Sequence, residues 1–202
     1  MAASTSRKSG RSAPRRGRTS ASASRGSVRA SQTDAITLLK ADHRQVEQWF
    51  EQFEKSRSDD KKRQLAQNIC KALTVHAQIE EEIFYPAFLE ATEETDLHHE
   101  AEVEHDGAKK LIAEIEASGP EDDYYDARVS VLSEMIKHHV KEEEQRGGMF
   151  AKARQSGMDL KELGQRLQAR KQELMQSGTR AKRLPSLMGG RRGRGGEMRL
   201  SI

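Results

Sequence analysis

A histidine followed four residues later by a glutamate occurs at His76 and Glu80, and again at His139 and Glu143, 63 residues further on. A further histidine precedes each copy, by 33 residues in the first case and by 34 in the second. Residues four apart lie on the same face of an α-helix, where an imidazole and a carboxylate can share one metal ion or bridge two. The duplication therefore predicts a metal site built on helices. Its six residues are, in chain order, His43, His76, Glu80, His105, His139 and Glu143.

Apolar residues recur at spacings of three and four in four segments, and the six residues fall on these apolar lines. Breakers separate the segments: a polar run at 56–60, a proline at Pro86, and the sequence Ser118-Gly119-Pro120. No segment shows the alternation of a half-buried strand. We therefore expect an all-α protein, an up-down-up-down four-helix bundle with one extra C-terminal helix.

The ends of the first two helices also have sequence signals. Thr33 or Asp34 is suited to cap the first helix, and Ser58 or Asp59 the second. Pro86 is expected to kink the second helix or to end it nearby. The face that this helix turns inward is predicted to carry Ile69, Leu73, His76, Glu80 and Ile83.

Composition divides the chain into four parts. Residues 1–31 contain eight Lys or Arg and no acidic residue, and residues 178–202 carry a net charge of +6. The first segment has almost no apolar residues to bury and the second is rich in glycine and arginine, so we expect disordered basic tails, Ser/Arg-rich at the start and Gly/Arg-rich at the end. The bundle is expected at 32–156, and an amphipathic helix, either docked or partly free, at 157–177.

Cysteine content and hydropathy indicate the compartment. The chain has one cysteine, Cys70, which excludes an intrachain disulfide and fits a reducing environment. No apolar run is long enough for a membrane span or a secretory signal. We therefore expect a cytoplasmic protein with no membrane partner, while its oligomeric state is left open.

Two neighbouring histidines compete for the second His-Glu pair. His138 with Glu142 has the same spacing as His139 with Glu143. Stepping back along the helix from His138 places Arg128 inside the bundle, whereas the line through His139 is apolar throughout. Periodicity thus favours His139 and Glu143, with His138 and Glu142 as the alternative.

Other polar residues near the six are expected to have lesser roles. Glu47 and Glu102 border the inward faces and are candidates for an extra ligand or a supporting group. Asp42 and Glu104, each directly before a histidine, are expected at the surface or in support of a ligand. His98 lies two turns, about 10 Å, before His105, too far to share one ion. The glutamates expected on solvated faces are Glu81, Glu82, Glu142 and Glu144.

Six ionisable groups facing the inside of a small bundle require an explanation. A lone histidine on an apolar face is usually a hydrogen-bonded core residue. Burying several unpaired charges, however, costs several kcal/mol each, against a total stability of about 5–15 kcal/mol. Bound cations remove that cost. The donors suit iron, zinc, nickel or copper, and six ligands exceed what one tetrahedral zinc needs. We expect two iron ions, bridged by Glu80 and Glu143.

The chain resembles the hemerythrin-like HHE cation-binding domains over about residues 33–155. The matching motifs are Leu38-Leu39-Lys40-Ala41-Asp42-His43, His76-x3-Glu80-Glu81-x3-Tyr85-Pro86, Val103-Glu104-His105 and His139-x3-Glu143-Glu144. The resemblance implies a four-helix bundle with a non-haem di-iron centre, histidines as terminal ligands and the two glutamates as bridges. Oxygen-carrying members have a fifth histidine where this chain has Lys109, which leaves one iron a ligand short.

Three functions follow as expectations. The first is a binding protein that holds or senses dioxygen, nitric oxide or iron; the absence of any other catalytic constellation favours it over an enzyme. The second is a di-iron oxidase or peroxidase that uses the same open positions. The third is an iron-binding protein associated with nucleic acid, because arginines in basic tails bind phosphate non-specifically.

Overall fold

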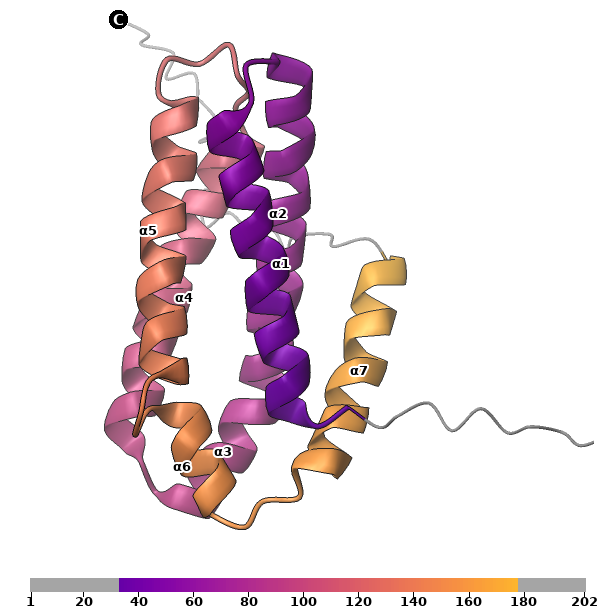
Figure 1. The fold of residues 1–202 in the computed structure, drawn as a ribbon, viewed down its shortest axis with the longest axis vertical. Helices are drawn as coiled ribbons and strands as arrows, with labels where there is room; N and C mark the ends of the chain where they lie inside the picture. The colour runs from indigo at the N-terminus through magenta and orange to yellow at the C-terminus, as the bar shows by residue number, and fades with distance from the viewer. Residues whose placement is uncertain (1–32, 178–202) are drawn as a thin grey trace, which may run out of the picture. The chain divides into compact units, whose positions relative to one another are not determined.

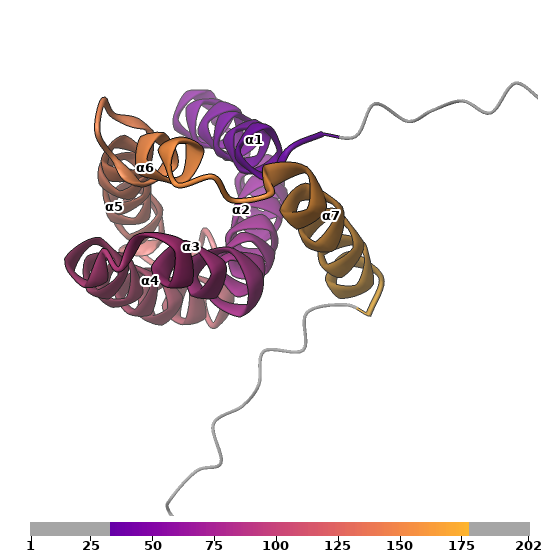
Figure 2. The same ribbon diagram turned by 90° about the horizontal axis from the view of Figure 1, so that it is seen from below.

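Helices account for almost all of residues 33–177, the part of the chain that the computed structural model describes. The tails expected at 1–31 and 178–202 lie outside these residues. Four long helices run alternately up and down, as predicted, and two short helices cover one end of them (Figures 1 and 2). In chain order the elements are α1 (Ala35–Lys55), α2 (Asp59–Ile79), the π-helical turn η1 (Glu80–Phe84), α3 (Tyr85–Thr92), α4 (Thr95–Glu116), α5 (Tyr125–Glu144), α6 (Met149–Gln155) and α7 (Leu160–Ser177).

Side-chain caps fix where the first two helices begin. Asp34 Oδ1 accepts a hydrogen bond from the Thr37 N–H at 2.9 Å, and Ser58 Oγ accepts one from the Lys61 N–H at 3.4 Å. Each satisfies a backbone donor that the first helical turn leaves without a partner. No helix within residues 33–177 is long and apolar enough to cross a membrane.

The second helix ends at Ile79, near Pro86 as expected, but the chain continues through the π-helical turn η1 into α3. One extra residue is inserted before Pro86, so that the Tyr85 N–H donates to the Glu80 carbonyl, five residues back. Pro86 then lies in the first turn of α3, where its missing N–H costs nothing. The inserted residue rotates the chain that follows. Phe84 and Tyr85 are buried as a result, and Ile83, expected on the inward face, is only half-buried.

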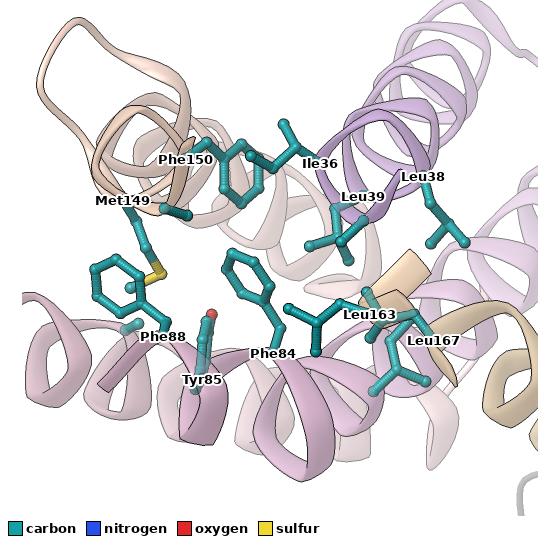
Figure 3. Packing of buried hydrophobic residues seen from close by; sticks show 14 of the residues in the cluster. Ile36, Leu38, Leu39, Phe84, Tyr85, Phe88, Met149, Phe150, Leu163 and Leu167 are labelled. Atoms are coloured by element: carbon teal, nitrogen blue, oxygen red, sulfur yellow. The ribbon is translucent and has the colours of Figure 1, made fainter. Parts of the chain in front are cut away.

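The end of the bundle near the six residues is closed by an apolar cluster. Phe84 and Phe88 from η1 and α3 face Phe150 from α6, with Ile36 and Leu39 of α1 beside them (Figure 3). Helix α6, which follows the pair Gly147-Gly148, is not among the helices that the apolar spacing predicts. The structure shows instead a tight turn, with Gly147 at φ +85°, which returns the chain toward the bundle.

Helix α7 is docked rather than free. Leu163 and Leu167 belong to the same apolar cluster as Leu39 of α1 (Figure 3). Gly164, between them, allows the closest approach: a Cβ atom there would lie 2.2 Å from the Thr33 carbonyl oxygen. The helix therefore packs directly against the backbone at the start of α1.

Replacing Gly164 by alanine is expected to destabilise the fold by about 2 kcal/mol or more, although alanine is ordinarily the better helix former by about 1 kcal/mol. The added methyl group would press on the α1 backbone, which cannot move aside cheaply. Gly107→Ala is the matched control in α4, because its methyl would meet only the flexible end of Met135. Urea denaturation measures both variants. Equal free energies of unfolding for the two would contradict the close packing of α7.

Candidate metal centre

The six residues singled out by the duplication are brought together inside the bundle. Each is at most 6% exposed, and they come from all four long helices and from η1. Apolar neighbours on the same helix faces are buried with them, which is why the three- and four-residue spacing located them. The six are His43 of α1, His76 of α2, Glu80 of η1, His105 of α4, and His139 and Glu143 of α5.

The histidines form two pairs. His43 Nε2 and His76 Nε2 are 3.0 Å apart, and the Nε2 atoms of the other pair, His105 and His139, are 3.3 Å apart. Their ligand atoms fall into two compact groups, in which all distances are within 4.8 Å. The first pair groups with both glutamates and the second pair with Glu80 alone. Two cations could therefore be held side by side.

The two glutamates lie between the histidine pairs. Glu80 Oε2 is 3.2 Å from His76 Nε2 and 3.5 Å from His105 Nε2, so it reaches both pairs. Glu143 Oε2 is 3.4 Å from His43 Nε2 and 3.7 Å from the Nε2 atom of His139. A carboxylate placed between two pairs of imidazoles has the position of a bridging ligand.

Outer carboxylates orient the imidazole rings. Three histidines contact a carboxylate through Nδ1, and an ionised carboxylate only accepts, so Nδ1 carries the proton and the Nε2 lone pair points inward. The fourth, His76, has its Nδ1 atom 3.5 Å from Asp42 Oδ2, without a hydrogen bond. The three bonds are His43–Glu144 at 2.8 Å, His105–Glu81 at 2.9 Å and His139–Glu104 at 2.8 Å.

These contacts correct the expectation that Glu81 and Glu144 lie on solvated faces. The side chain of Glu144 is 12% exposed, and Lys40 and Arg44 also contact it. Burial alone would raise the pKa of Glu144, but the hydrogen bond with His43 and the two cations hold it at about 2. This carboxylate therefore stays ionised and keeps the His43 proton on Nδ1.

Facing lone pairs are the main electrostatic feature of the centre. Burial lowers the pKa of His43 to about 4, which keeps its ring neutral. Two neutral rings that each carry the proton on Nδ1 would turn their Nε2 lone pairs against each other, which is repulsive. Either a proton or a metal ion must lie between them. The paired donors fit a metal ion, with release of any proton on binding.

Two buried carboxylate oxygens that lack hydrogen-bond partners could also bind these metal ions. Glu80 Oε1 and Glu143 Oε2 make no hydrogen bond with any described residue, although both side chains are buried. Burial and the neighbouring charge of Glu80 raise the pKa of Glu143, so the metal-free site would hold one of its two carboxylates as the acid. Cations would allow both to ionise and would satisfy their free oxygens.

Tyr85 is a site residue that the spacing argument did not find. Its hydroxyl oxygen is 3.2 Å from His105 Nε2, 3.3 Å from Glu143 Oε1 and 3.5 Å from Glu80 Oε2. The ring is fully buried, and burial together with the two carboxylates raises its pKa well above the usual value, so the hydroxyl remains protonated. The extra residue of η1 brings it inward, and no helical periodicity could have shown this.

The remaining sequence candidates lie outside the cluster. His138 is 59% exposed and contacts Glu104, whereas His139 is buried. Glu47 and Glu102 are both more than half exposed. Lys109, at the fifth-histidine position, lies outside with them: its Nζ atom is 2.7 and 2.8 Å from the two Glu81 oxygens.

A small cavity adjoins the four histidines. Its volume is about 30 Å³, and apolar side chains such as Val46, Leu73 and Ile112 form much of its wall. A cavity of this size can hold about one water-sized molecule. The centre thus has room for a diatomic ligand beside it, but none for a larger substrate.

Comparisons with known proteins bear on the family and the fold of this chain. The sequence model of the Hemerythrin HHE cation binding domain matches residues 34–150. A DNA nickase of Nostoc sp. is 31% identical over 107 residues, which cover 53% of this chain but 30% of that protein. A crystal structure of a Hemerythrin HHE cation binding domain-containing protein from Mycobacterium kansasii superposes with a TM-score of 0.60 at 22% identity, covering 71% of this chain and 88% of that one.

Proposed function

The chain belongs to the hemerythrin HHE cation-binding domain family, and from this premise we propose that it holds two iron ions and binds or senses dioxygen, nitric oxide or iron. Metal binding of the hemerythrin type follows from the family itself. The two facing Nε2 pairs, at 3.0 and 3.3 Å, support the proposal for two ions, because one metal ion between the rings of each pair would satisfy both lone pairs.

Each protein group has a definite part in this proposal. The four histidines would be terminal ligands through Nε2, and outer carboxylates hold the Nδ1 atoms of three of them, His43, His105 and His139. Glu80 and Glu143 are the bridging carboxylates. Iron is favoured by the mixture of imidazole and carboxylate donors, although zinc, nickel and copper accept the same atoms. The proposed ligands are His43, His76, Glu80, His105, His139 and Glu143.

The surroundings of the centre support a small gaseous ligand. A bound iron pair would supply redox chemistry and open coordination positions. The cavity of about 30 Å³ admits a diatomic molecule, and its apolar wall disfavours water. The Tyr85 hydroxyl, 3.3 Å from Glu143 Oε1, is placed to donate a hydrogen bond to that carboxylate.

Protein loaded with iron(II) without oxygen is expected to develop near-ultraviolet absorption on exposure to dioxygen, and a different spectrum on exposure to nitric oxide. The reason is that iron changes its electronic state on binding either gas, whereas zinc, which has no redox chemistry, does not. Absorption spectroscopy of the iron and zinc forms makes the comparison. If the iron form responds to neither gas, the gas-binding part of the proposal is wrong.

The second candidate function is that of an oxidase or peroxidase, and Lys109 favours it. Lys109 stands where oxygen-carrying members of the family have a fifth histidine, and its ammonium group pairs with Glu81. One metal ion would therefore have one protein ligand fewer. Assays of hydrogen peroxide consumption separate the two functions. Sustained turnover that disappears in Glu143→Ala would favour the enzyme, and its absence would favour a binding protein.

We also propose that the basic tails of this chain bind nucleic acid. The Nostoc relative is a DNA nickase, but this chain spans about a third of its length. The basic segments 1–31 and 178–202 are the reason to expect phosphate binding. Their removal should abolish retention on DNA at low salt, and unchanged retention would exclude this role.

A further inference from the structure

Each of the four outer carboxylates that lie behind the histidines is itself in contact with a lysine or histidine side chain. Three of these partners come from the bundle helices α1, α4 and α5; the pairs are Lys40–Glu144, Lys109–Glu81 and His138–Glu104. The fourth partner, Lys171, comes from α7 and pairs with Asp42, the carboxylate behind His76. Outer support for one histidine is therefore supplied from outside the four-helix bundle.

The pair of Lys171 and Asp42 is partly buried and lies directly beside a ligand. The Lys171 ammonium group donates to Asp42 Oδ1, and the other oxygen, Oδ2, is 3.5 Å from His76 Nδ1. The two side chains are 28% and 16% exposed. This contact with Nδ1 is the longest of the four, since the other three are hydrogen bonds of 2.8–2.9 Å. The orientation of His76 thus depends most on what holds its carboxylate in place.

Helix α7 also holds η1, the turn that carries Glu80. Arg170, which precedes Lys171 in the chain, donates from Nε to Glu82 Oε2 at 2.7 Å and from Nη2 to Glu82 Oε1 at 3.2 Å. A two-point contact of this kind fixes orientation as well as position. Two neighbouring residues of α7 therefore hold groups next to two of the proposed ligands, His76 and Glu80.

These contacts do not follow from the family assignment. The matching family model ends at residue 150, and α7 begins at Leu160. Leu163 and Leu167 dock the helix, because they belong to the same apolar cluster as Phe84 of η1 (Figure 3). A partly exposed ion pair alone contributes little to docking. The apolar face thus fixes the helix, and its charged residues determine which groups near the centre it touches.

We propose that α7 is a structural part of the metal centre, with Lys171 as a positioning residue. Lys171 acts through Asp42, which it holds in place to accept the Nδ1 proton of His76, so that the Nε2 lone pair faces the metal ion. This role rests on the proposed function, because it concerns one of the two proposed ions. We call it the first ion, and its ligand group is His43, His76, Glu80 and Glu143. The second ion has its outer support within the bundle.

Competition with a chelator, on the full chain loaded with iron(II) without oxygen, tests this role. Lys171→Met keeps the apolar stem and removes the charge. It should weaken binding of the first ion about tenfold, as loss of support behind a ligand typically does, and leave the second ion unchanged. Lys171→Arg, which keeps the charge, should retain most of the affinity. Lys161→Met is the matched control and should behave as the wild type, because Lys161 is exposed on the same helix.

A double variant separates action through Asp42 from a general loosening of α7. Asp42→Asn alone should weaken the first ion selectively, because it removes the charge that Lys171 holds. Adding Lys171→Met to Asp42→Asn should then cause no further loss, whereas independent effects would add. Additive losses, equal weakening of both ions, or unchanged affinities in Lys171→Met would each overturn the proposal.

The iron content of the wild type keeps this proposal apart from the proposed function. Two irons per chain in the wild type, with the same retention in Lys171→Met, would contradict only the role of Lys171. A loaded wild type that holds no iron would contradict the proposed function itself, and the role of Lys171 with it. Elemental analysis at each chelator concentration gives both results.

Discussion

Removal of the bound metal is expected to lower Tm by about 10 °C or more. Without metal ions, a proton must lie between the facing histidine nitrogens, and Glu80 Oε1 and Glu143 Oε2 remain buried without a hydrogen-bond partner among the described residues. A ligand present at a thousand times its dissociation constant stabilises the folded state by about 4 kcal/mol, and 1 kcal/mol corresponds to about 2–4 °C in a domain of this size. Calorimetry of the protein before and after exhaustive chelation gives the difference.

The control for this experiment is a chelator already saturated with metal, which should leave Tm unchanged. Adding iron back should restore the original Tm. Equal stability of the chelated and untreated samples, when metal analysis shows that the ions have left, would mean that the six residues are tolerated inside the bundle without cations. That outcome would remove the physical basis of the proposed centre.

The two glutamates are expected to differ in their effect on metal content. Glu80 belongs to both ligand groups, so Glu80→Gln should release both ions. The metal affinity should fall by more than about 100-fold, which is more than the loss of a residue that only supports a ligand usually causes. Glu143 belongs to only one group, so Glu143→Gln should keep at least one ion. Elemental analysis of the purified variants measures this difference.

Glu47→Gln is the matched control for both substitutions. Glu47 also follows a histidine by four residues, but its side chain is 54% exposed and belongs to neither ligand group. Its metal content should equal that of the wild type. In the metal-free state, Glu143→Gln should change the free energy of unfolding little, because a neutral amide replaces a carboxyl group that burial and Glu80 keep as the acid. Equal metal contents in all three variants would contradict the proposed ligand assignment.

The positions of the six residues could be predicted because they follow the helical period. His139 was distinguished from His138 by the apolar line that leads to it, and the structure buries the first and exposes the second. The cap at Asp34 could be predicted for a similar local reason, since it depends only on the residues beside it. Features that repeat with the helix, or that lie within one turn, are therefore readable from the sequence.

Contacts between helices could not be predicted in this way. Glu144 looks like one of several solvated acids, and its bond to His43 joins residues 101 positions apart. Tyr85 was missed for a different reason, because the helical period fails at η1. Ser133 is also outside the predicted apolar line of α5, although it is buried. The burial of Glu144 and Ser133 depends on how two helices approach each other.

The π-helical turn has a consequence for how this chain tolerates changes in length. One residue corresponds to about 100° of rotation in an α-helix. A deletion of one residue within Glu80–Phe84 would leave a regular helix, so local stability alone would not oppose it. It would nevertheless swing the Tyr85 phenol and the rings of Phe84 and Phe88 away from the interior. An apparently harmless shortening would thus open the end of the bundle nearest the centre.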